Sequence, residues 1–308
     1  MTRFASVSRR RPVMAVLTVL LAVTGSGTPV LGAPPLSNCP LFPSTNVWNK
    51  RVDSLPVAAK SDAFINAIGR SAPLHPDFGS YLGYGIPYNV VDSSTPPRTV
   101  RFDYDDESDH VPYPIPASPK IEGGSDRHLL MWDTEDCRLY ELFAARKTAS
   151  GWRAGSGATW DLTSNALRPN GWTSADAAGL PILPGLVRRD EVLAGAIQHA
   201  IRFTAPRTRN AHIYPARHHA GAGGCSCLPP MGLRVRLKQG FDITGFSPRM
   251  RVILRAMKRY GMILADNGSP WYFQGVSNVG WSDDELNQLK TLHGRNFEVV
   301  DTSSLRNG

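Results

Sequence analysis

The chain has 308 residues, of which 42% are hydrophobic, 9% aromatic and 19% charged, a composition typical of globular proteins. Its 25 prolines and 28 glycines disfavour long uninterrupted helices and exclude an all-helical bundle. The formal net charge is +8, but residues 1–33 contain four arginines and no acidic residue. The rest carries only about +4 without a dense basic run, which excludes a nucleic-acid interface built on phosphate neutralisation.

The first 33 residues have the pattern of a secretory signal peptide. Arg3 and Arg9 to Arg11 precede an apolar run, 13–23, that is too short to span a bilayer. Small residues follow, and cleavage is expected near Gly32 or Ala33. An uncleaved N-terminal membrane anchor is the alternative. We therefore expect a secreted, extracellular, monomeric protein with one globular domain, 34–308, and no membrane partner after cleavage.

The four cysteines agree with export, because disulfides persist in oxidising compartments. Cys39 directly follows the predicted signal peptide, and Cys137 falls in a turn between two expected strands. A Cys39–Cys137 disulfide would tie the N-terminal segment to the sheet. Cys225 and Cys227 would then pair with each other, remain free or bind a metal.

The first half of the mature chain contains one expected helix followed by strands. Ser61 is expected to cap a helix through Ile68, which Gly69 ends. Residues 127–133 and 138–145 predict a hairpin, because two strand-like runs flank a short turn. Two further strands are expected on the pattern of their apolar residues: 99–104 and 151–160.

Two helices and four strands are expected in the second half. Asp190 is expected to cap a helix to His199. Ser247 caps a second helix to Tyr260, which Gly261 ends. Strands are expected at 201–204 and 232–237, the latter with Arg234 and Arg236 on a solvated face, and at 262–265 and 271–274, joined as a hairpin by Asn267-Gly268.

The last segment completes the expected fold. Ser282 and Glu285 form a capping box for a final helix, and 297–300 reads as a short strand. The elements together predict an α+β, β-rich domain. We expect an antiparallel sheet or β-sandwich with a few peripheral helices and long ordered loops.

Carboxylates beside aromatic residues are the main chemical signal. Asp266 stands in the predicted turn just before Trp271 and Tyr272. Sugar-cleaving sites need a carboxylic acid near flat rings that stack on the sugar. The competing interpretation is that Asp266, with Asn267, serves only to form the turn.

Two further loops supply candidate partners for that acid. Glu122 and Asp126 lie four residues apart, with glycines between them and His128 close by, so their pKa values can influence each other. Trp160-Asp161 and Trp172 form the second group, whose mixture of aromatic and acidic groups suits polyhydroxyl ligands. Both groups have structural alternatives: a polar surface loop for the first and turn or helix caps for the second.

A histidine cluster gives the rival prediction. His212, His218 and His219 lie within eight residues, and Cys225 follows a glycine-rich stretch. Such ligands hold zinc or copper in other proteins, although this spacing matches no standard zinc pattern. His218 is alternatively a substrate-orienting or acid–base group. We expect no metal and no other cofactor in the main hypothesis.

Several segments together resemble a known group of proteins. They are Cys39-Pro40-Leu41-Phe42-Pro43, 179–192, Pro229-Pro230-Met231-Gly232-Leu233-Arg234 and 260–269. In these segments the chain resembles a group of secreted, largely uncharacterised proteins of high-GC soil bacteria, and the resemblance spans nearly the whole mature chain. It implies export and a single intact domain, and it assigns no catalytic residue.

The sequence therefore favours a secreted carbohydrate-active enzyme, a glycoside hydrolase acting on an extracellular polysaccharide or cell-wall glycan. Asp266 would act with Glu122, Asp126 or Asp161. Six residues would bind the substrate: Trp160, Trp172, His218, Asn267, Trp271 and Tyr272. The alternatives are a non-catalytic carbohydrate- or cell-wall-binding protein and a metal-dependent hydrolase that uses His212, His218 and His219.

Overall fold

The computed structural model describes residues 39–221 and 223–307, which all belong to one compact unit. The predicted signal peptide and its cleavage site lie outside the described residues. The α+β, β-rich class is confirmed, but the sheets are mixed rather than purely antiparallel. Every helix in the described part is too short or too polar to span a lipid bilayer.

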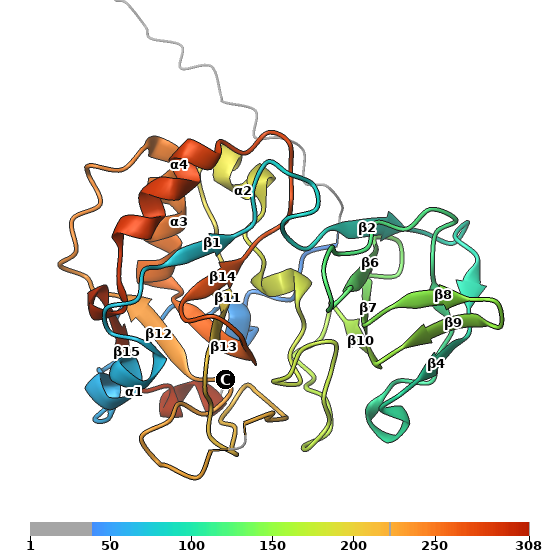
Figure 1. The fold of residues 1–308 in the computed structure, drawn as a ribbon, viewed down its shortest axis with the longest axis horizontal. Helices are drawn as coiled ribbons and strands as arrows, with labels where there is room; N and C mark the ends of the chain where they lie inside the picture. Colours follow the sequence, from blue (N-terminus) through green and yellow to red (C-terminus); the bar gives the residue numbers. More distant parts are fainter. Residues whose placement is uncertain (1–38, 222, 308) are drawn as a thin grey trace, which may run out of the picture. The chain divides into compact units, whose positions relative to one another are not determined.

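The larger sheet has six strands in the order β1-β14-β11-β13-β12-β15 (Figure 1). Their bounds are β1 His75–Asp77, β11 Ile201–Ala205, β12 Arg234–Leu237, β13 Met262–Asn267, β14 Tyr272–Gln274 and β15 Phe297–Val299. β1 pairs with β14, and β11 with β13, in parallel, whereas the other pairs are antiparallel. Buried residues of this sheet, such as Phe203, Leu264 and Phe273, belong to the main hydrophobic core.

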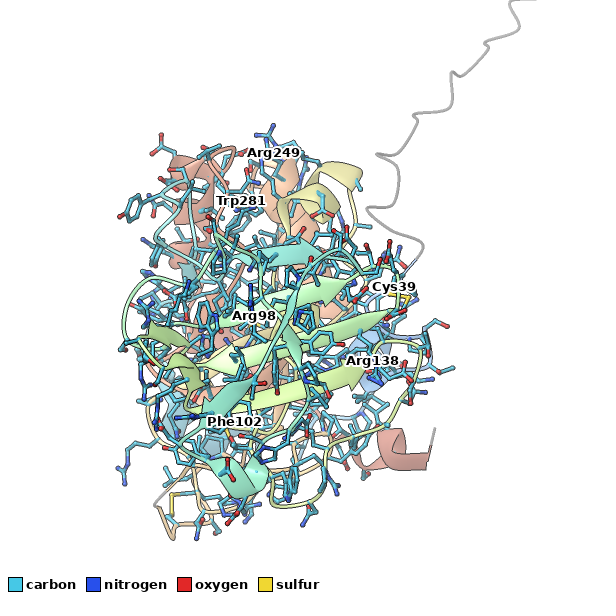
Figure 2. All side chains as sticks on the ribbon, turned by 90° about the vertical axis from the view of Figure 1, so that its right-hand side faces the viewer. Cys39, Arg98, Phe102, Arg138, Arg249 and Trp281 are labelled. Carbon is cyan, nitrogen blue, oxygen red and sulfur yellow. A yellow bond between two sulfur atoms is a disulfide. The ribbon has the colours of Figure 1, made fainter. Side chains whose placement is uncertain are left out.

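A second sheet has four strands in the order β10-β7-β6-β2. Their bounds are β2 Tyr88–Val91, β6 Leu129–Asp133, β7 Arg138–Phe143 and β10 Ser156–Asp161. Figure 2 looks onto this side of the protein, where Arg138 marks the start of β7. The predicted β6–β7 hairpin is confirmed. The strand expected at 151–160 is two strands in different sheets, because the chain breaks at Gly155.

The remaining strands form two small sheets beside the second one. β4 Val100–Phe102, β8 Arg146–Thr148 and β9 Gly151–Ala154 make a three-stranded sheet, and β3 Pro97–Arg98 pairs with β5 Tyr113–Pro114. Phe102 and Tyr113 belong to a second, smaller hydrophobic cluster. The described residues thus bury two apolar clusters, and the second sheet contributes residues to both of them.

Four α-helices flank the sheets: α1 Ser61–Ile68, α2 Arg189–Ala194, α3 Pro248–Arg259 and α4 Asp283–Gln288. The caps Ser247 and Ser282 are confirmed, because their hydroxyls accept from Met250 and Glu285 N–H groups. Lys60, not Ser61, is the N-cap of α1. α2 starts after Arg188 rather than Asp190 and stops at Gly195, short of the expected His199.

Six 3₁₀ segments complete the described structure: η1 Val47–Asn49, η2 Asp105–Glu107, η3 Leu183–Gly185, η4 Leu289–Thr291, η5 Gly294–Asn296 and η6 Ser303–Asn307. η4 extends α4 by a tighter turn, and η5 leads directly into β15.

Two sequence expectations about the large sheet are wrong. β13 and β14 do not form a hairpin, because β11 lies between them in the sheet. Arg234 and Arg236 on β12 are buried rather than solvated. The Arg234 guanidinium donates to backbone carbonyls of Val47, Lys50 and Tyr260. Each arginine thus joins the N-terminal segment to the sheet through hydrogen bonds that offset the burial of its charge.

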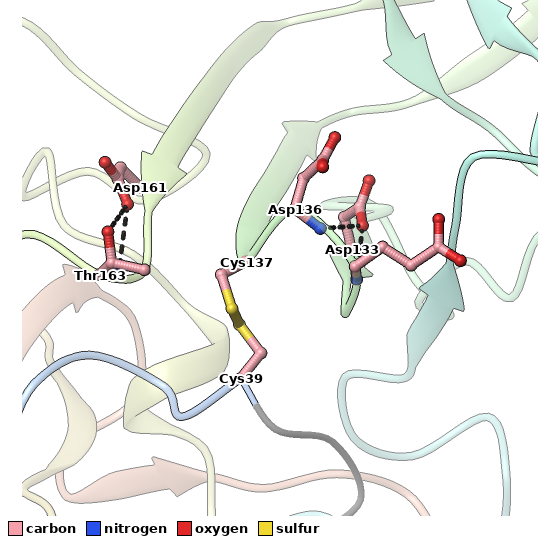
Figure 3. Close-up of a disulfide and its surroundings, with 7 residues drawn as sticks. Cys39, Asp133, Asp136, Cys137, Asp161 and Thr163 are labelled. Carbon is pink, nitrogen blue, oxygen red and sulfur yellow. Dashed lines mark hydrogen bonds between the residues drawn. A yellow bond between two sulfur atoms is a disulfide. The ribbon is translucent and has the colours of Figure 1, made fainter.

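Two disulfides are present, Cys39–Cys137 and Cys225–Cys227. Figure 3 shows Cys39 bonded to Cys137 at the β6–β7 turn, as the sequence predicts. This bridge ties the start of the described chain to the second sheet. Cys225 and Cys227 pair with each other, which settles the alternatives left open for them.

Candidate functional site

Two adjoining cavities contain most of the predicted acidic residues. The larger has a volume of about 390 Å³ and the smaller about 280 Å³. Asp126, Asp266 and Asn267 line both cavities, so the Asp266 carboxylate lies where the two meet. We call this pair of cavities the acidic cleft.

Arg202 on β11 organises the carboxylates of the acidic cleft. Its Nε and Nη2 donate to Asp176 Oδ2 at 3.2 and 3.0 Å. Its Nη2 also lies 3.9 Å from Asp266 Oδ2. The Asp176 side chain is 0% exposed, while that of Asp266 is 27% exposed. One guanidinium therefore faces two carboxyl groups, and only Asp266 is accessible to a ligand in solvent.

Both carboxyl groups hold their protons more tightly than usual. Burial raises the pKa of Asp176 to about 7, against the opposing charge of Arg202. Burial also raises the pKa of Asp266, although Arg202 and His128 oppose it. Two acids beside one cation, one of them fully buried and the other partly buried, favour a state that retains a proton. Asp266 can therefore donate a proton at a pH where an exposed aspartate is fully ionised.

A β-bulge places Asp266 at the edge of the cleft. The β11–β13 register pairs Phe203 with Leu264 and Thr204 with Asp266, so Ala265 is the extra residue. Its carbonyl accepts from the Ala178 N–H at 3.0 Å, which holds the loop that bears Asp176. Bulges next to active sites commonly reorient a side chain in this way.

Further contacts hold the Asp176 loop on its other side. Buried Arg168 donates to Asp109 Oδ2 at 2.7 Å and to the carbonyls of Thr173 and Glu107. Ser174 Oγ donates to the Leu180 carbonyl at 2.6 Å. Because these groups are buried and bonded, Asp176 is fixed before any ligand arrives.

His128 and Glu122 form a second buried ion pair at the cleft. His128 Nδ1 donates to Glu122 Oε2 at 2.5 Å, and its Nε2 donates to the Ala175 carbonyl at 3.0 Å. Since both ring nitrogens face acceptors, the ring must carry two protons. Burial opposes that charge, but the bond to Glu122 raises the pKa of His128. Glu122 is therefore committed to His128 and holds it against the Asp176 loop.

The four sequence-predicted acids thus separate into two groups. Asp266, Asp126 and Glu122 line the smaller cavity together. Asp161 lines neither cavity of the acidic cleft. It is exposed and accepts from the Thr163 N–H and hydroxyl, near the Cys39–Cys137 disulfide (Figure 3). These contacts fit the turn-capping interpretation of Asp161, and the structure does not bring it together with the other three acids.

The expected aromatic platform is wrong for two of its members. Trp271 is 0% exposed and stacks between Phe203 and Phe297 in the core. Trp160 is 4% exposed. Neither indole ring is accessible to a sugar. Both residues follow the general tendency of large apolar side chains to be buried.

The other expected binding residues lie nearer to solvent. Tyr272 is half-buried and lines the smaller cavity, where its ring stacks on His75 at 4.0 Å. His218 lines the larger cavity, where its Nδ1 donates to the Ala177 carbonyl. Trp172 is half-buried, and the centroid of its ring lies 5.5 Å from Arg168 Cζ, but Trp172 lines neither cavity.

The histidine cluster does not support a metal centre. His219 stacks on both His212 and His218, with ring centroids 5.4 and 5.6 Å apart. In the described ranges, 39–221 and 223–307, no group of three or more His, Cys, Asp or Glu side chains has a geometry that could hold a metal ion. The metal-dependent alternative therefore has no site among these residues.

A cavity of about 960 Å³ lies elsewhere, lined by residues such as Leu82, Tyr88, Leu193 and Val279. None of the sequence-predicted site residues lines it. Its wall is rich in apolar side chains, and it lacks the convergent carboxylates that acid–base chemistry needs.

Sequence reasoning missed three residues that line the acidic cleft: Asp77, Arg202 and Gln274. Arg202 had a signal, because a charged residue inside the apolar run Ile201–Phe203 needs a buried partner. Asp176 lies in the loop of mixed aromatic and acidic residues, where a capping role was the competing interpretation. Asp77 and Gln274 carry no local signal, since only the β1–β14 pairing brings them together.

Comparison of the chain with family models, with curated proteins and with solved structures gives no match.

Proposed function

We propose that this protein is a glycoside hydrolase that acts on an extracellular polysaccharide or cell-wall glycan, with Asp266 as its general acid. One observation carries the proposal. Asp266 lies at the junction of two cavities, with a raised pKa, a further carboxylate and an aromatic ring beside it. Glycosidic cleavage needs this combination of a protonated acid, an ionised acid and flat apolar surface.

The proposed chemistry begins with proton transfer. Asp266 gives its proton to the glycosidic oxygen as the bond from that oxygen to the anomeric carbon breaks. Asp126, which lines both cavities, supplies the second carboxylate and stabilises the positive charge that develops at that carbon. Water then completes the hydrolysis, and a proton returns to Asp266.

The neighbours of Asp266 keep it ready for this step. Arg202 is held by Asp176 and remains near Asp266, so it stabilises the carboxylate that forms when the proton leaves. The charge on Arg202 lowers the pKa that burial raises. A balance of this kind gives an acid that holds its proton more tightly than an exposed aspartate and can still release it.

Aromatic rings at the two cavities can receive sugar rings. Tyr272 lines the smaller cavity, and Tyr104 lines the larger one with 57% of its surface exposed. Each presents a flat apolar surface with a polar hydroxyl, which suits the alternating faces of a sugar. The two disulfides and the predicted signal peptide support an extracellular location for this substrate.

A panel of polysaccharides with reducing-end detection tests the proposal. We expect the wild type to release reducing ends from at least one glycan and Asp266→Asn to lose about 10² to 10⁴-fold of that rate, the usual contribution of a general acid. Asp242→Asn is the matched control, because Asp242 is exposed and accepts from the Thr244 N–H and hydroxyl in the loop before α3. Turnover that survives Asp266→Asn unchanged would contradict the assignment.

A further inference from the structure

Four of the side chains that line the smaller cavity already donate hydrogen bonds within the protein. Both His128 ring nitrogens donate within the protein, and Arg202 donates through Nε and Nη2 to Asp176. The Thr204 hydroxyl donates to the Ser269 carbonyl, and Asn267 Nδ2 donates to the Ala220 carbonyl. These groups have little capacity left for a ligand that needs donors.

The smaller cavity of the acidic cleft has a buried hydrogen-bond acceptor that lacks a donor in the described part of the chain. Gln274 lines the smaller cavity, is 6% exposed, and its buried Oε1 has no hydrogen-bond partner among the described residues. A buried acceptor without a donor is costly, so a ligand that supplies N–H groups gains affinity there.

The charged groups of the acidic cleft also favour a ligand that carries hydrogen-bond donors and positive charge. Six carboxyl groups line the two cavities: Asp77, Glu107, Glu122, Asp126, Asp176 and Asp266. The groups that can oppose them there are Arg202, His128 and His218. Even with Asp176 and Asp266 protonated, carboxylates are not outnumbered by cations. The cleft therefore disfavours uronic acids and sulfated sugars and favours a cation.

An aromatic face completes a site for an ammonium group. The Tyr272 ring lines the smaller cavity and stacks on His75 with an interplanar angle of 8°. Burial and then the charge of Lys290 lower the pKa of His75, so the ring behind Tyr272 is neutral near pH 7. An aromatic face flanked by carboxylates and an amide oxygen attracts ammonium ions.

We infer that the smaller cavity binds the ammonium group of an amino sugar, and that the substrate is a glycan with free amino groups. Gln274 Oε1 and the Asp77 carboxyl accept from the ammonium, while Tyr272 contacts the sugar ring. This inference rests on the proposed function, because it names the substrate class of the same cleft.

Binding calorimetry with inactive protein tests the inference separately from catalysis. Asp266→Asn protein is titrated with a glucosamine tetramer and with the N-acetylglucosamine tetramer, which has the same backbone but neutral amides. At about pH 6, below the usual pKa of an amino group, we expect the amino tetramer to bind at least about tenfold more tightly. Equal affinity for the two tetramers would overturn the inference.

Two variants in the Asp266→Asn background assign the preference to residues. Gln274→Leu removes the unpartnered acceptor, and Asp77→Asn removes a charge while keeping the shape of the side chain. We expect each to reduce binding of the amino tetramer several-fold and to leave the N-acetyl tetramer unchanged. An unchanged preference in both variants, with native thermal unfolding, would overturn the assignment.

Two further measurements, titration with tetralysine and glycan cleavage by the wild type, separate this inference from the proposed function. Tetralysine supplies ammonium groups without a sugar, and binding as tight as that of the amino tetramer would overturn the choice of a glycan. Preferential binding of the amino tetramer without cleavage of any glycan by the wild type would support the inference and contradict the hydrolase. Cleavage of neutral glycans without preferential binding of the amino tetramer would support the hydrolase and contradict the inference.

Discussion

Neighbouring residues of this chain have opposite roles, and Trp271 and Tyr272 show this most clearly. The Trp271 indole N–H donates to the Gly69 carbonyl at 2.7 Å, and its ring packs between two phenylalanines. The Tyr272 ring instead lines the acidic cleft. Trp271 stands in the turn just before β14, with a φ of 60°, whereas Tyr272 is the first residue of that strand, so the two neighbouring rings reach the core and the site respectively.

This difference predicts opposite effects of truncation. Trp271→Ala should lower the free energy of unfolding by about 3–5 kcal/mol, because a large core ring leaves a cavity. Tyr272→Ala should cost much less stability but weaken glycan binding. Urea denaturation of both variants, with glycan binding measured on Tyr272→Ala, checks this. A small stability loss for Trp271→Ala would place that ring outside the core.

The sequence predicts only in part which side chains face the cleft. The acid at position 266 stood out because aromatic residues follow it closely. Whether Trp271 or Tyr272 faces the cavity depends on the two strands that pair with β14. These strands, β1 and β11, both begin far earlier in the chain. Local pattern alone cannot supply this choice.

At the scale of elements, one carboxylate connects strand β7 to the segment that precedes α2. Buried Glu141 accepts from the Ile182 and Leu183 N–H groups, at distances from 2.9 to 3.0 Å, where η3 begins. Burial raises its pKa to about 7, against these backbone bonds. The contact joins the second sheet to the loop that leads from Asp176 to α2.

The raised pKa predicts a pH dependence of stability. Between its ordinary pKa of 4.5 and about 7, Glu141 keeps a proton when the protein is folded and loses it when the protein is unfolded. Its stabilising contribution is therefore complete below 4.5 and is lost as the pH rises through about 7. Asp176 acts in the same direction.

Glu141→Gln should remove part of this dependence. The amide keeps the shape and an acceptor for Ile182 and Leu183 but does not titrate. Urea denaturation at about pH 5 and about pH 7.5 should show a smaller loss of stability in the variant than in the wild type. The same loss in both proteins would show that Glu141 titrates normally in the folded state.

Element by element, the sequence predicted what local signals determine. The caps of α3 and α4, the β6–β7 hairpin and the turn at Gly69 follow from residue types within a few positions. The expected β13–β14 hairpin failed because β11 inserts between strands that are close in the sequence. Arg234 looked solvated because its acceptor carbonyls at Val47 and Lys50 are far away along the chain.

At the scale of the whole molecule, the acidic cleft collects residues from distant parts of the chain. Glu122 and His128 come from the segment before β6, Asp176 from a long loop, and Arg202 and Asp266 from strands of the larger sheet. The candidate acids Glu122, Asp126 and Asp266 were each visible in the sequence. Their common location was not, because it depends on contacts across more than a hundred residues.

The Cys39–Cys137 disulfide is the covalent link across this arrangement, and it gives a prediction for global stability. Its half-cystines lie 98 residues apart, and closing such a loop stabilises the fold by about 4–5 kcal/mol in the chain-entropy model. Replacing both cysteines by serine should cost about this amount in urea denaturation. Cys225→Ser with Cys227→Ser is the matched control, because a separation of 2 residues restricts the unfolded chain little. Similar costs for the two double variants would contradict the loop-length argument.

The central claim is that Asp266 keeps a proton that it can transfer to a bound glycan. Carboxyl carbon NMR titration of the labelled protein measures this directly, with Asp266→Asn used to assign the resonance. We predict that Asp266 titrates clearly above its ordinary pKa of 3.8, since burial favours the neutral acid. Titration of Asp266 at or below 3.8 would mean that it is ionised at neutral pH and would contradict its role as the general acid.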